Sequence, residues 1–136
     1  MIEAVTLSER WLFPPDTDAP DKAQGALRSV LREASISDGV TDDALIVINE
    51  LVHATVGQTP SGAADELDVS VAVDLDKVRV EIAGGQVEDD NRVMRLVEEL
   101  SDRWGVEHVG SDRVWFELNR QTRSLTSYLG PSLDHP

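Results

Sequence analysis

Hydrophobic and polar residues alternate along several short stretches of this chain, and a period of two predicts β-strands. The first stretch covers roughly residues 5–13 and ends at two prolines. The stretches 69–73 and 78–82 are separated only by residues 74–77, so they predict a β-hairpin. A second hairpin is expected from 106–109 and 113–118. Hairpins imply a mostly antiparallel sheet.

Three other stretches repeat their apolar residues at helical spacing, over about 20–34, 41–56 and 93–100. Pro20 suits a first helical turn, residues 37–39 should break the first helix, and Thr41 can cap the second. The second helix is apolar on more than one face, so we expect it to lie centrally against the sheet.

These elements predict an α/β two-layer sandwich (α+β), in which about three helices cover one face of the sheet. The 136 residues suit one domain, which we place at 1–118. The remaining residues, 119–136, have weak periodicity and are expected to form a tail, either loose or docked through Leu125 and Tyr128.

The charge excludes some classes of partner. With 26 acidic and 12 basic residues the net charge is −14, which opposes direct binding to nucleic acid. No apolar run is long enough to span a membrane, and no signal peptide is visible. The absence of cysteine excludes disulfides and thiolate metal sites. We therefore expect a cytoplasmic protein that does not bind membranes.

Two segments resemble the histidine-kinase-like (GHKL) ATPase domain of anti-sigma-factor serine kinases. One is ALIVINELVHATVGQ at 44–58, which carries the Glu-Leu-Val of the first nucleotide-binding box. The other is RLVEELSDRWGVEHVGSDRVWFEL at 95–118, with the Asp-Arg-Trp-Gly and Val-Trp-Phe of the family's last helix and hairpin. The resemblance implies a Bergerat-like fold for about residues 5–118.

The resemblance also implies a role for each position of the nucleotide site. Glu50 stands where the family has its catalytic base, but Ala54 replaces the asparagine that binds Mg²⁺. A methyl group cannot coordinate a cation that requires oxygen ligands. Gly84 stands where an aspartate would bind adenine, and Asn91 and Val93 replace the two glycines that approach phosphate.

The segment that would form the nucleotide lid is short as well. Only residues 85–90 separate Gly84 from Asn91, and Glu88, Asp89 and Asp90 would repel phosphate. The resemblance therefore implies a degenerate pocket. We expect no cofactor and no catalytic residue, with Glu50 as a vestigial base that serves mainly as an ordinary helix residue; ATP and Mg²⁺ enter only if the site is active but divergent.

No histidine forms a metal-ligand pattern, so no metal site is expected. His53 lies three residues after Glu50, yet no third ligand is evident, and His108 and His135 stand apart. The acidic clusters at 16–21 and 88–90 lack the spacing of a calcium loop.

Two further features favour structural roles. Ser61-Gly62 lacks the strand-turn-helix context of a nucleophile elbow. Trp104 and Trp115 favour packing within the last helix–hairpin unit, with anchoring of a partner as the alternative.

The sequence leaves three functions open. The favoured one is a regulatory protein-binding domain, an anti-sigma-like factor or its antagonist, that acts by sequestration without ATP hydrolysis. Its partner would be a sigma factor or a STAS-type anti-anti-sigma factor, a homodimer is possible, and the contact region would be 5–31. The second is a divergent ATP-dependent serine kinase with Glu50 as base. The third is a pocket adapted to another small ligand.

Overall fold

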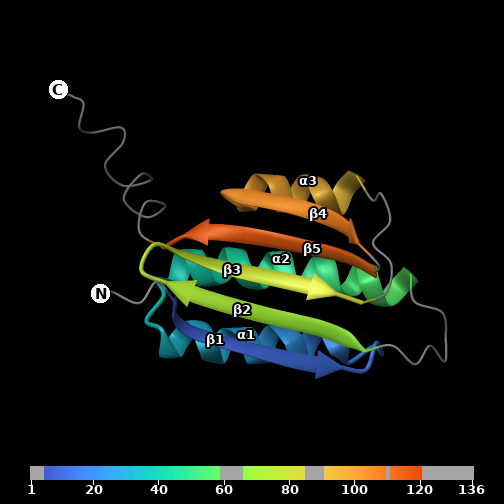
Figure 1. Cartoon of the computed structure of the whole chain (residues 1–136), viewed down its shortest axis with the longest axis horizontal. Coiled ribbons are helices and arrows are strands. Elements are labelled where there is room, and N and C mark those ends of the chain that lie inside the picture. The colour runs from blue at the N-terminus through green and yellow to red at the C-terminus, as the bar shows by residue number, and fades with distance from the viewer. Residues whose placement is uncertain (1–4, 59–65, 85–90, 110, 121–136) are drawn as a thin grey trace.

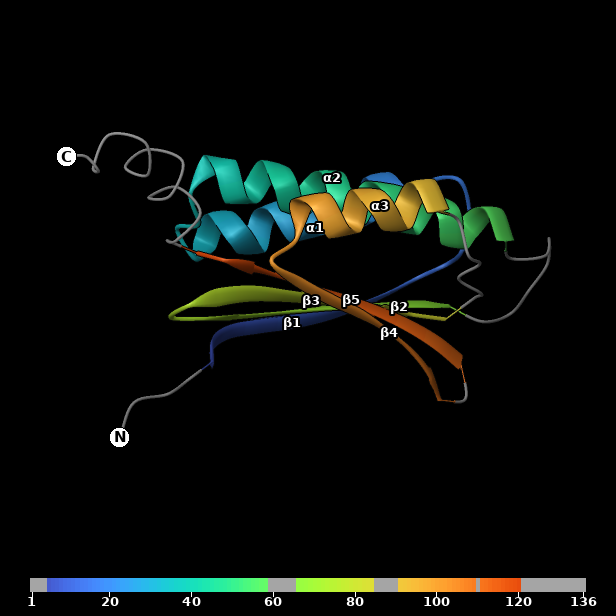
Figure 2. The same ribbon diagram turned by 90° about the horizontal axis from the view of Figure 1, so that it is seen from above.

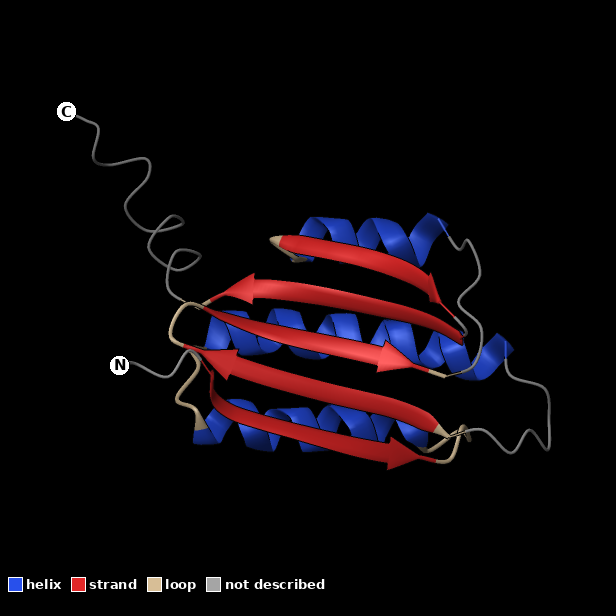
Figure 3. Cartoon of the chain, in the orientation of Figure 1, coloured by secondary structure: helices blue, strands red, loops and turns tan. Residues whose placement is uncertain are grey.

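The computed structural model describes residues 5–58, 66–84, 91–109 and 111–120. Its helices and strands are shown in Figure 3. In chain order they are β1 (Val5–Phe13), α1 (Ala19–Glu33), α2 (Asp38–Gln58), β2 (Leu67–Asp74), β3 (Lys77–Ala83), α3 (Asn91–Leu100), β4 (Arg103–Val109) and β5 (Ser111–Asn119).

The five strands form one antiparallel sheet in the order β1-β2-β3-β5-β4 (Figure 1). All three helices lie on the same face of this sheet (Figure 2). The predicted α+β sandwich, with a mostly antiparallel sheet covered on one face, is confirmed.

Alternation along the strands places the apolar side chains under the helices. In β2 and β3, buried residues alternate with partly exposed ones, and Val71 lies opposite Val80 in the register. Phe116 of β5 is fully buried on the same face. The sheet therefore has an apolar face that the helices cover and a polar face that they do not.

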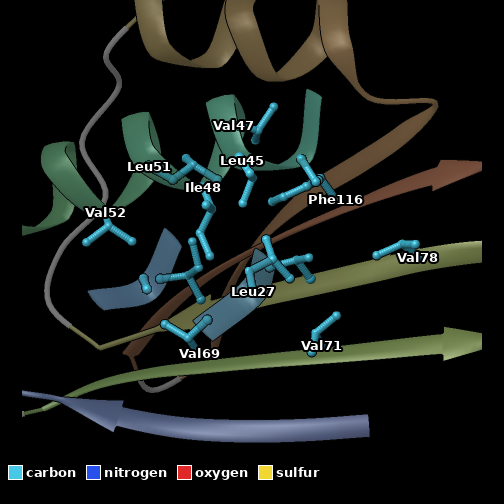
Figure 4. Packing of buried hydrophobic residues seen from close by; sticks show 14 of the residues in the cluster. Leu27, Leu45, Val47, Ile48, Leu51, Val52, Val69, Val71, Val78 and Phe116 are labelled. Atoms are coloured by element: carbon cyan, nitrogen blue, oxygen red, sulfur yellow. The ribbon is translucent and has the colours of Figure 1, made fainter. Parts of the chain in front are cut away.

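Helix α2 lies between α1 and α3 and runs across the middle of the sheet (Figure 1). Ile48 and Leu51 of α2 meet Leu27 of α1 and Val69 of β2 in the core (Figure 4). Contacts with two helices and the sheet explain why α2 is apolar on more than one face. The predicted central position of this helix is confirmed. No helix within the described ranges combines the length and apolar character needed to cross a membrane.

The start of α2 differs from the sequence-based expectation. The helix begins at Asp38 rather than near Thr41, so residues 37–39 do not form the break. The chain instead reverses at Ser35, whose φ is 59°. Ser37 then caps α2: its Oγ accepts the N–H of Val40 at 3.4 Å, and its carbonyl accepts the N–H of Thr41 at 2.9 Å. Thr41 is therefore an interior helix residue.

Strand β4 also begins earlier than predicted, at Arg103 rather than Val106. Its first residue pairs with Glu117 of β5. Strand β5 lies between β3 and β4 in the sheet. The prediction missed this early start because Gly105 interrupts the alternation of polar and apolar residues on which it relied.

Arg120 ties the end of β5 to two distant segments. Its backbone N–H donates to the carbonyl of Asp76, and its guanidinium donates to the carbonyls of Asp74 (2.7 Å) and Ala34 (3.1 Å). One side chain thus holds the β2–β3 turn against the end of α1. The expected tail contacts of Leu125 and Tyr128 lie outside the described residues.

The β2–β3 turn depends on one carboxylate. Oδ1 of Asp74 accepts the N–H groups of Asp76 and Lys77, both at 2.8 Å, and Oδ2 accepts from the Lys77 ammonium at 3.2 Å. Burial raises the pKa of Asp74, but these donors favour the charged form more strongly, and the net pKa is lowered.

We predict that Asp74→Ala lowers the free energy of unfolding at pH 7 by about 1–2 kcal/mol, because two backbone donors lose a charged acceptor. A carboxyl whose pKa is depressed by folding stabilises the protein above its unfolded-state pKa, and this contribution is lost as the pH falls through the folded-state value. The difference from the native chain should therefore shrink below about pH 4.

Urea denaturation between pH 7 and pH 3 measures this difference. Asp74→Asn is the control, since it keeps an acceptor oxygen but removes the charge. It should cost less than Asp74→Ala at pH 7. A penalty for Asp74→Ala that stayed constant across the whole pH range would contradict the assignment.

Candidate functional site

A groove of about 470 Å³ lies between α2 and α3. Glu50 lines it from α2, and the other lining residues, Arg92, Val93, Arg95, Leu96 and Glu99, come from α3. The fold thus brings two of the residues singled out in the sequence, Glu50 and Val93, to one groove. A volume of this size suits a small molecule.

The α2 wall of the groove offers one carboxylate. Glu50 is partly buried, and Ala54 follows one helical turn later, where it packs against the core. His53 is exposed, and the described lining of the groove does not include it. The Glu50–His53 pair therefore does not act as a unit in this groove.

Gly84 follows directly after β3 in a conformation that favours glycine. Its φ is 101°, and a Cβ added there would lie 2.5 Å from the carbonyl oxygen of Glu66. Real Cβ contacts are never this short, so any other side chain would require the backbone to move. The sequence indicates the absence of an adenine-binding carboxylate at Gly84, and the structure supplies a physical reason for glycine at this position.

The start of α3 does not provide a phosphate cradle made of glycines. Asn91 is the first residue of α3, and the Val93 side chain is 7% exposed and belongs to the core cluster. A buried β-branched side chain thus occupies the position where the resemblance places a glycine. The acidic run 88–90 lies outside the described residues.

Two cations beside the groove were not anticipated. Arg92 and Arg95 are three residues apart on α3, and both side chains are exposed on the groove side. Their signal in the sequence is the amphipathic pattern of α3, whose other face holds Val97 and Leu100. Glu50 of α2 and Glu99 of α3 also line the groove, so the formal charge of the lining is zero.

Other candidate sites have simple structural explanations or lie outside the described residues. Asp16 accepts the N–H of Asp18 at 3.0 Å, which orders the turn before α1. Within the described part of the chain, no three potential metal-ligating side chains are gathered together. The side chain of His108, and all of His135 and Ser61-Gly62, lie outside the described residues.

A search of solved structures shows which known architecture this chain shares. It resembles the crystal structure of the RsbU and RsbW domains of Rv1364c from Mycobacterium tuberculosis, with a TM-score of 0.70 and 18% sequence identity. The match covers 83% of this chain and 32% of that chain, so this chain spans about a third of the length of the chain it matches.

The chain has the histidine-kinase-like fold. At this level of identity the likeness establishes the fold alone. No protein-family model matches the sequence, and no curated protein matches it either.

Within this histidine-kinase-like fold, Asp102, Arg103, Trp104 and Gly105 each have a structural role. Oδ2 of Asp102 accepts the N–H of Asn119 at 2.7 Å, which joins the start of β4 to the end of β5. Trp104 lies opposite Phe116 in the sheet and is 36% exposed. The most specific part of the resemblance therefore reports on the fold rather than on the nucleotide site.

Gly105 makes room for an aromatic ring. It pairs with Trp115 in the sheet, and a Cβ on Gly105 would lie 2.7–2.8 Å from three atoms of the Trp115 indole. The guanidinium of Arg79 lies over the same indole, 4.2 Å from the ring centre. Trp115 is thus held between a neighbouring backbone and a cation, as a packing residue.

Glu117 completes this cluster on the uncovered face. It is 4% exposed, and its Oε2 accepts from Nη1 of Arg79 at 2.8 Å. Nε of Arg103 lies 3.8 Å from Oε1, which has no hydrogen-bond partner among the described residues. Burial lowers the pKa of Arg79, but its hydrogen bonds to Glu81 and Glu117 outweigh this and raise it, so Arg79 stays charged.

We predict opposite stability effects for two glycine-to-alanine substitutions. Gly105→Ala should destabilise the chain by about 1–3 kcal/mol, because the new methyl group collides with the Trp115 indole. Gly25→Ala should stabilise it by about 0.5–1 kcal/mol, because Gly25 lies within α1 and a Cβ there meets nothing within 4 Å.

Thermal unfolding followed by circular dichroism compares the two variants, and tryptophan fluorescence reports on the Trp115 environment. Gly105→Ala should change the emission spectrum, whereas Gly25→Ala should not. Equal and same-signed changes in Tm would contradict the proposed contact between Gly105 and Trp115.

Proposed function

We propose that this chain is a regulatory protein-binding domain of the anti-sigma-factor type, or an antagonist of such a factor, that acts in the cytoplasm by sequestration without ATP hydrolysis. The observation that carries the proposal is Gly84, whose left-handed backbone against the Glu66 carbonyl leaves no room for an adenine-binding side chain. The histidine-kinase-like fold supports the class of partner, a sigma factor or a STAS-type anti-anti-sigma factor.

Two further positions support the same proposal. Ala54 presents a methyl group one helical turn from Glu50, and Val93 fills its position with a buried side chain. Neither supplies an oxygen ligand for Mg²⁺ or the open backbone that a phosphate group needs. On this proposal, Glu50 is a residue of the groove wall and not a catalytic base.

The alternative is a divergent ATP-dependent serine kinase, and the groove itself is the observation in its favour. Glu50 lines the groove together with Arg92 and Arg95, so a carboxylate and two guanidinium groups are available. A phosphate could meet these arginines, and Glu50 would be the base.

Calorimetric titration with Mg·ATP separates the two functions. We predict no binding tighter than about 1 mM for the native chain, and no recovery in an Ala54→Asn, Gly84→Asp double variant. Recovery is not expected because an aspartate at Gly84 requires the backbone beside Glu66 to move. The single variant Ala54→Asn is the control, and it should be more stable than the double variant.

Binding by the native chain tighter than roughly 100 µM, or about −5.5 kcal/mol, would favour the kinase, because that affinity requires organised contacts. Loss of phosphotransfer in Glu50→Gln would then assign the base. Thermal melts of all variants show whether a negative titration reflects an unfolded protein.

Capture of partners from the native host tests the sequestration proposal. The full chain should retain a sigma-type or STAS-type protein, and Arg28→Glu on α1 should reduce this, because Arg28 is exposed within the proposed contact region 5–31. Arg95→Glu on α3 makes the same charge change outside that region and should have little effect. Recovery of neither class of protein would count against the proposal, and a stronger effect of Arg95→Glu would move the contact to the groove.

A further inference from the structure

Strand β4 forms one edge of the sheet. The strand order is β1-β2-β3-β5-β4, so β4 pairs with β5 on one side, and the described residues place no strand on its other side (Figure 1). Every second residue of such an edge strand points its backbone N–H and C=O away from the sheet. The register from Arg103 to Val109 is continuous, so β4 offers a regular row of these groups to one more strand.

The other edge strand, β1, is less suited to pairing with a further strand. Its register with β2 shifts between Val5 and Leu7, and Pro14 and Pro15 follow it directly. Register shifts and prolines are features by which natural sheets protect their edges from further pairing. Strand β4 contains no proline, and no shift interrupts its pairing with β5. Of the two edges, β4 is therefore the one that can accept a strand.

The covered side of the β4 edge is apolar and incompletely buried. Trp104 and Val106 lie opposite the buried Phe116 and Val114, so both belong to the face that the helices cover. Trp104 is nonetheless 36% exposed, and Val106 is only partly buried. Apolar side chains of an added strand would find a surface to pack on here.

Helix α3 forms a wall above this edge. It contacts α2 on one side and β4 below, and Arg95 and Glu99 line its groove with α2. At about 100° per residue, Met94 and Glu98 lie on the opposite flank of α3, toward the outer edge of the sheet. Met94 is partly buried and Glu98 is exposed, so this flank is apolar near the sheet and acidic farther from it.

Carboxylates lie around the apolar strip. Glu98 is on α3, and Glu107 is exposed on the uncovered face of β4. Asp102, just before β4, is also exposed. Arg103 is a cation of the same strand, but its Nε lies 3.8 Å from Oε1 of the buried Glu117. The local charge, like the net charge of −14, therefore favours a basic partner.

We propose that the β4 edge binds an extended segment of a partner protein, in which apolar residues alternate with lysine or arginine. The segment adds a strand to the sheet and pairs with the outward N–H and C=O groups of β4. Its apolar side chains pack on Met94, Trp104 and Val106, and one of its cations meets Glu107. This contact involves neither the α2–α3 groove nor the region 5–31, so it does not rest on the function proposed above.

Titration of the isotope-labelled full chain with a synthetic peptide tests the proposal by NMR. The probe is acetyl-Thr-Val-Lys-Val-Lys-Val-Thr-amide, whose sequence is the same in both directions and therefore suits a parallel or an antiparallel strand. At about 0.15 M NaCl we expect saturable shifts of the amide signals of β4, Met94 and Glu98, with a dissociation constant on the order of 0.1–1 mM. No saturable shift up to about 5 mM peptide, or shifts concentrated in β1, would overturn the proposal.

Two N-methylated peptides separate strand addition from simple attraction between charges. One carries methyl groups on the backbone nitrogens of its valines, and the other on those of its lysines. Because alternate N–H groups of an added strand face β4, one of these peptides should bind at least about 10-fold more weakly than the unmodified peptide. The other should bind within about 3-fold of it. Equal effects of the two modifications would mean that the backbone does not pair with β4, and the proposal would fail.

Glu107→Lys tests the charge contact, and Glu9→Lys is its matched control. Both make the same change at an exposed position of an edge strand, in β4 and β1 respectively. Glu107→Lys should weaken binding of the probe at least about 3-fold, and Glu9→Lys should leave it within about 2-fold. A larger effect of Glu9→Lys than of Glu107→Lys would contradict the assignment to β4. Circular dichroism of both variants confirms that they are folded, and none of these results depends on the sigma-type partner.

Discussion

A five-stranded sheet has two faces, and within the described residues this chain supplies helices for only one of them. That constraint determines the rest of the structure. On the covered face, α2 must be apolar over most of its circumference, because it touches α1, α3 and the sheet. On the other face, the strands must carry polar side chains. Ion pairs between neighbouring strands, such as Arg10–Asp68, neutralise the charges of these side chains.

The same division explains what the sequence could predict. A period of two identifies the strands because one face is buried and the other is not, and the apolar α2 segment implies a central position. The predicted starts of α2 and β4 were wrong because each start depends on one local feature. For α2 this is the chain reversal at Ser35, and for β4 it is the pairing of Arg103 with Glu117. No periodicity encodes either of these.

For the candidate site, the sequence identifies positions but not their reasons. Gly84 stands out as a missing aspartate, yet its positive φ and its closeness to Glu66 depend on how β2 and β3 begin and end. Burial of Glu117 follows from its neighbours Arg79 and Trp115. Trp115 precedes Glu117 by two residues in β5, but Arg79 lies beside Glu117, and over the Trp115 ring, only through the register of β3 and β5. In the sequence, Arg92 and Arg95 cannot be told apart from other charged surface residues. Only the packing of α3 beside α2 brings them to the same groove as Glu50.

The strand order has a consequence for folding. Because β5 lies between β3 and β4, the hairpin of β2 and β3 can form early, but β4 has no sheet partner until the last strand has been made. Arg120, immediately after that strand, then reaches back to Ala34 and Asp74. During synthesis, the apolar face under α3 therefore stays incomplete until almost all of residues 5–120 have emerged, and this is the period in which the chain is most exposed to aggregation.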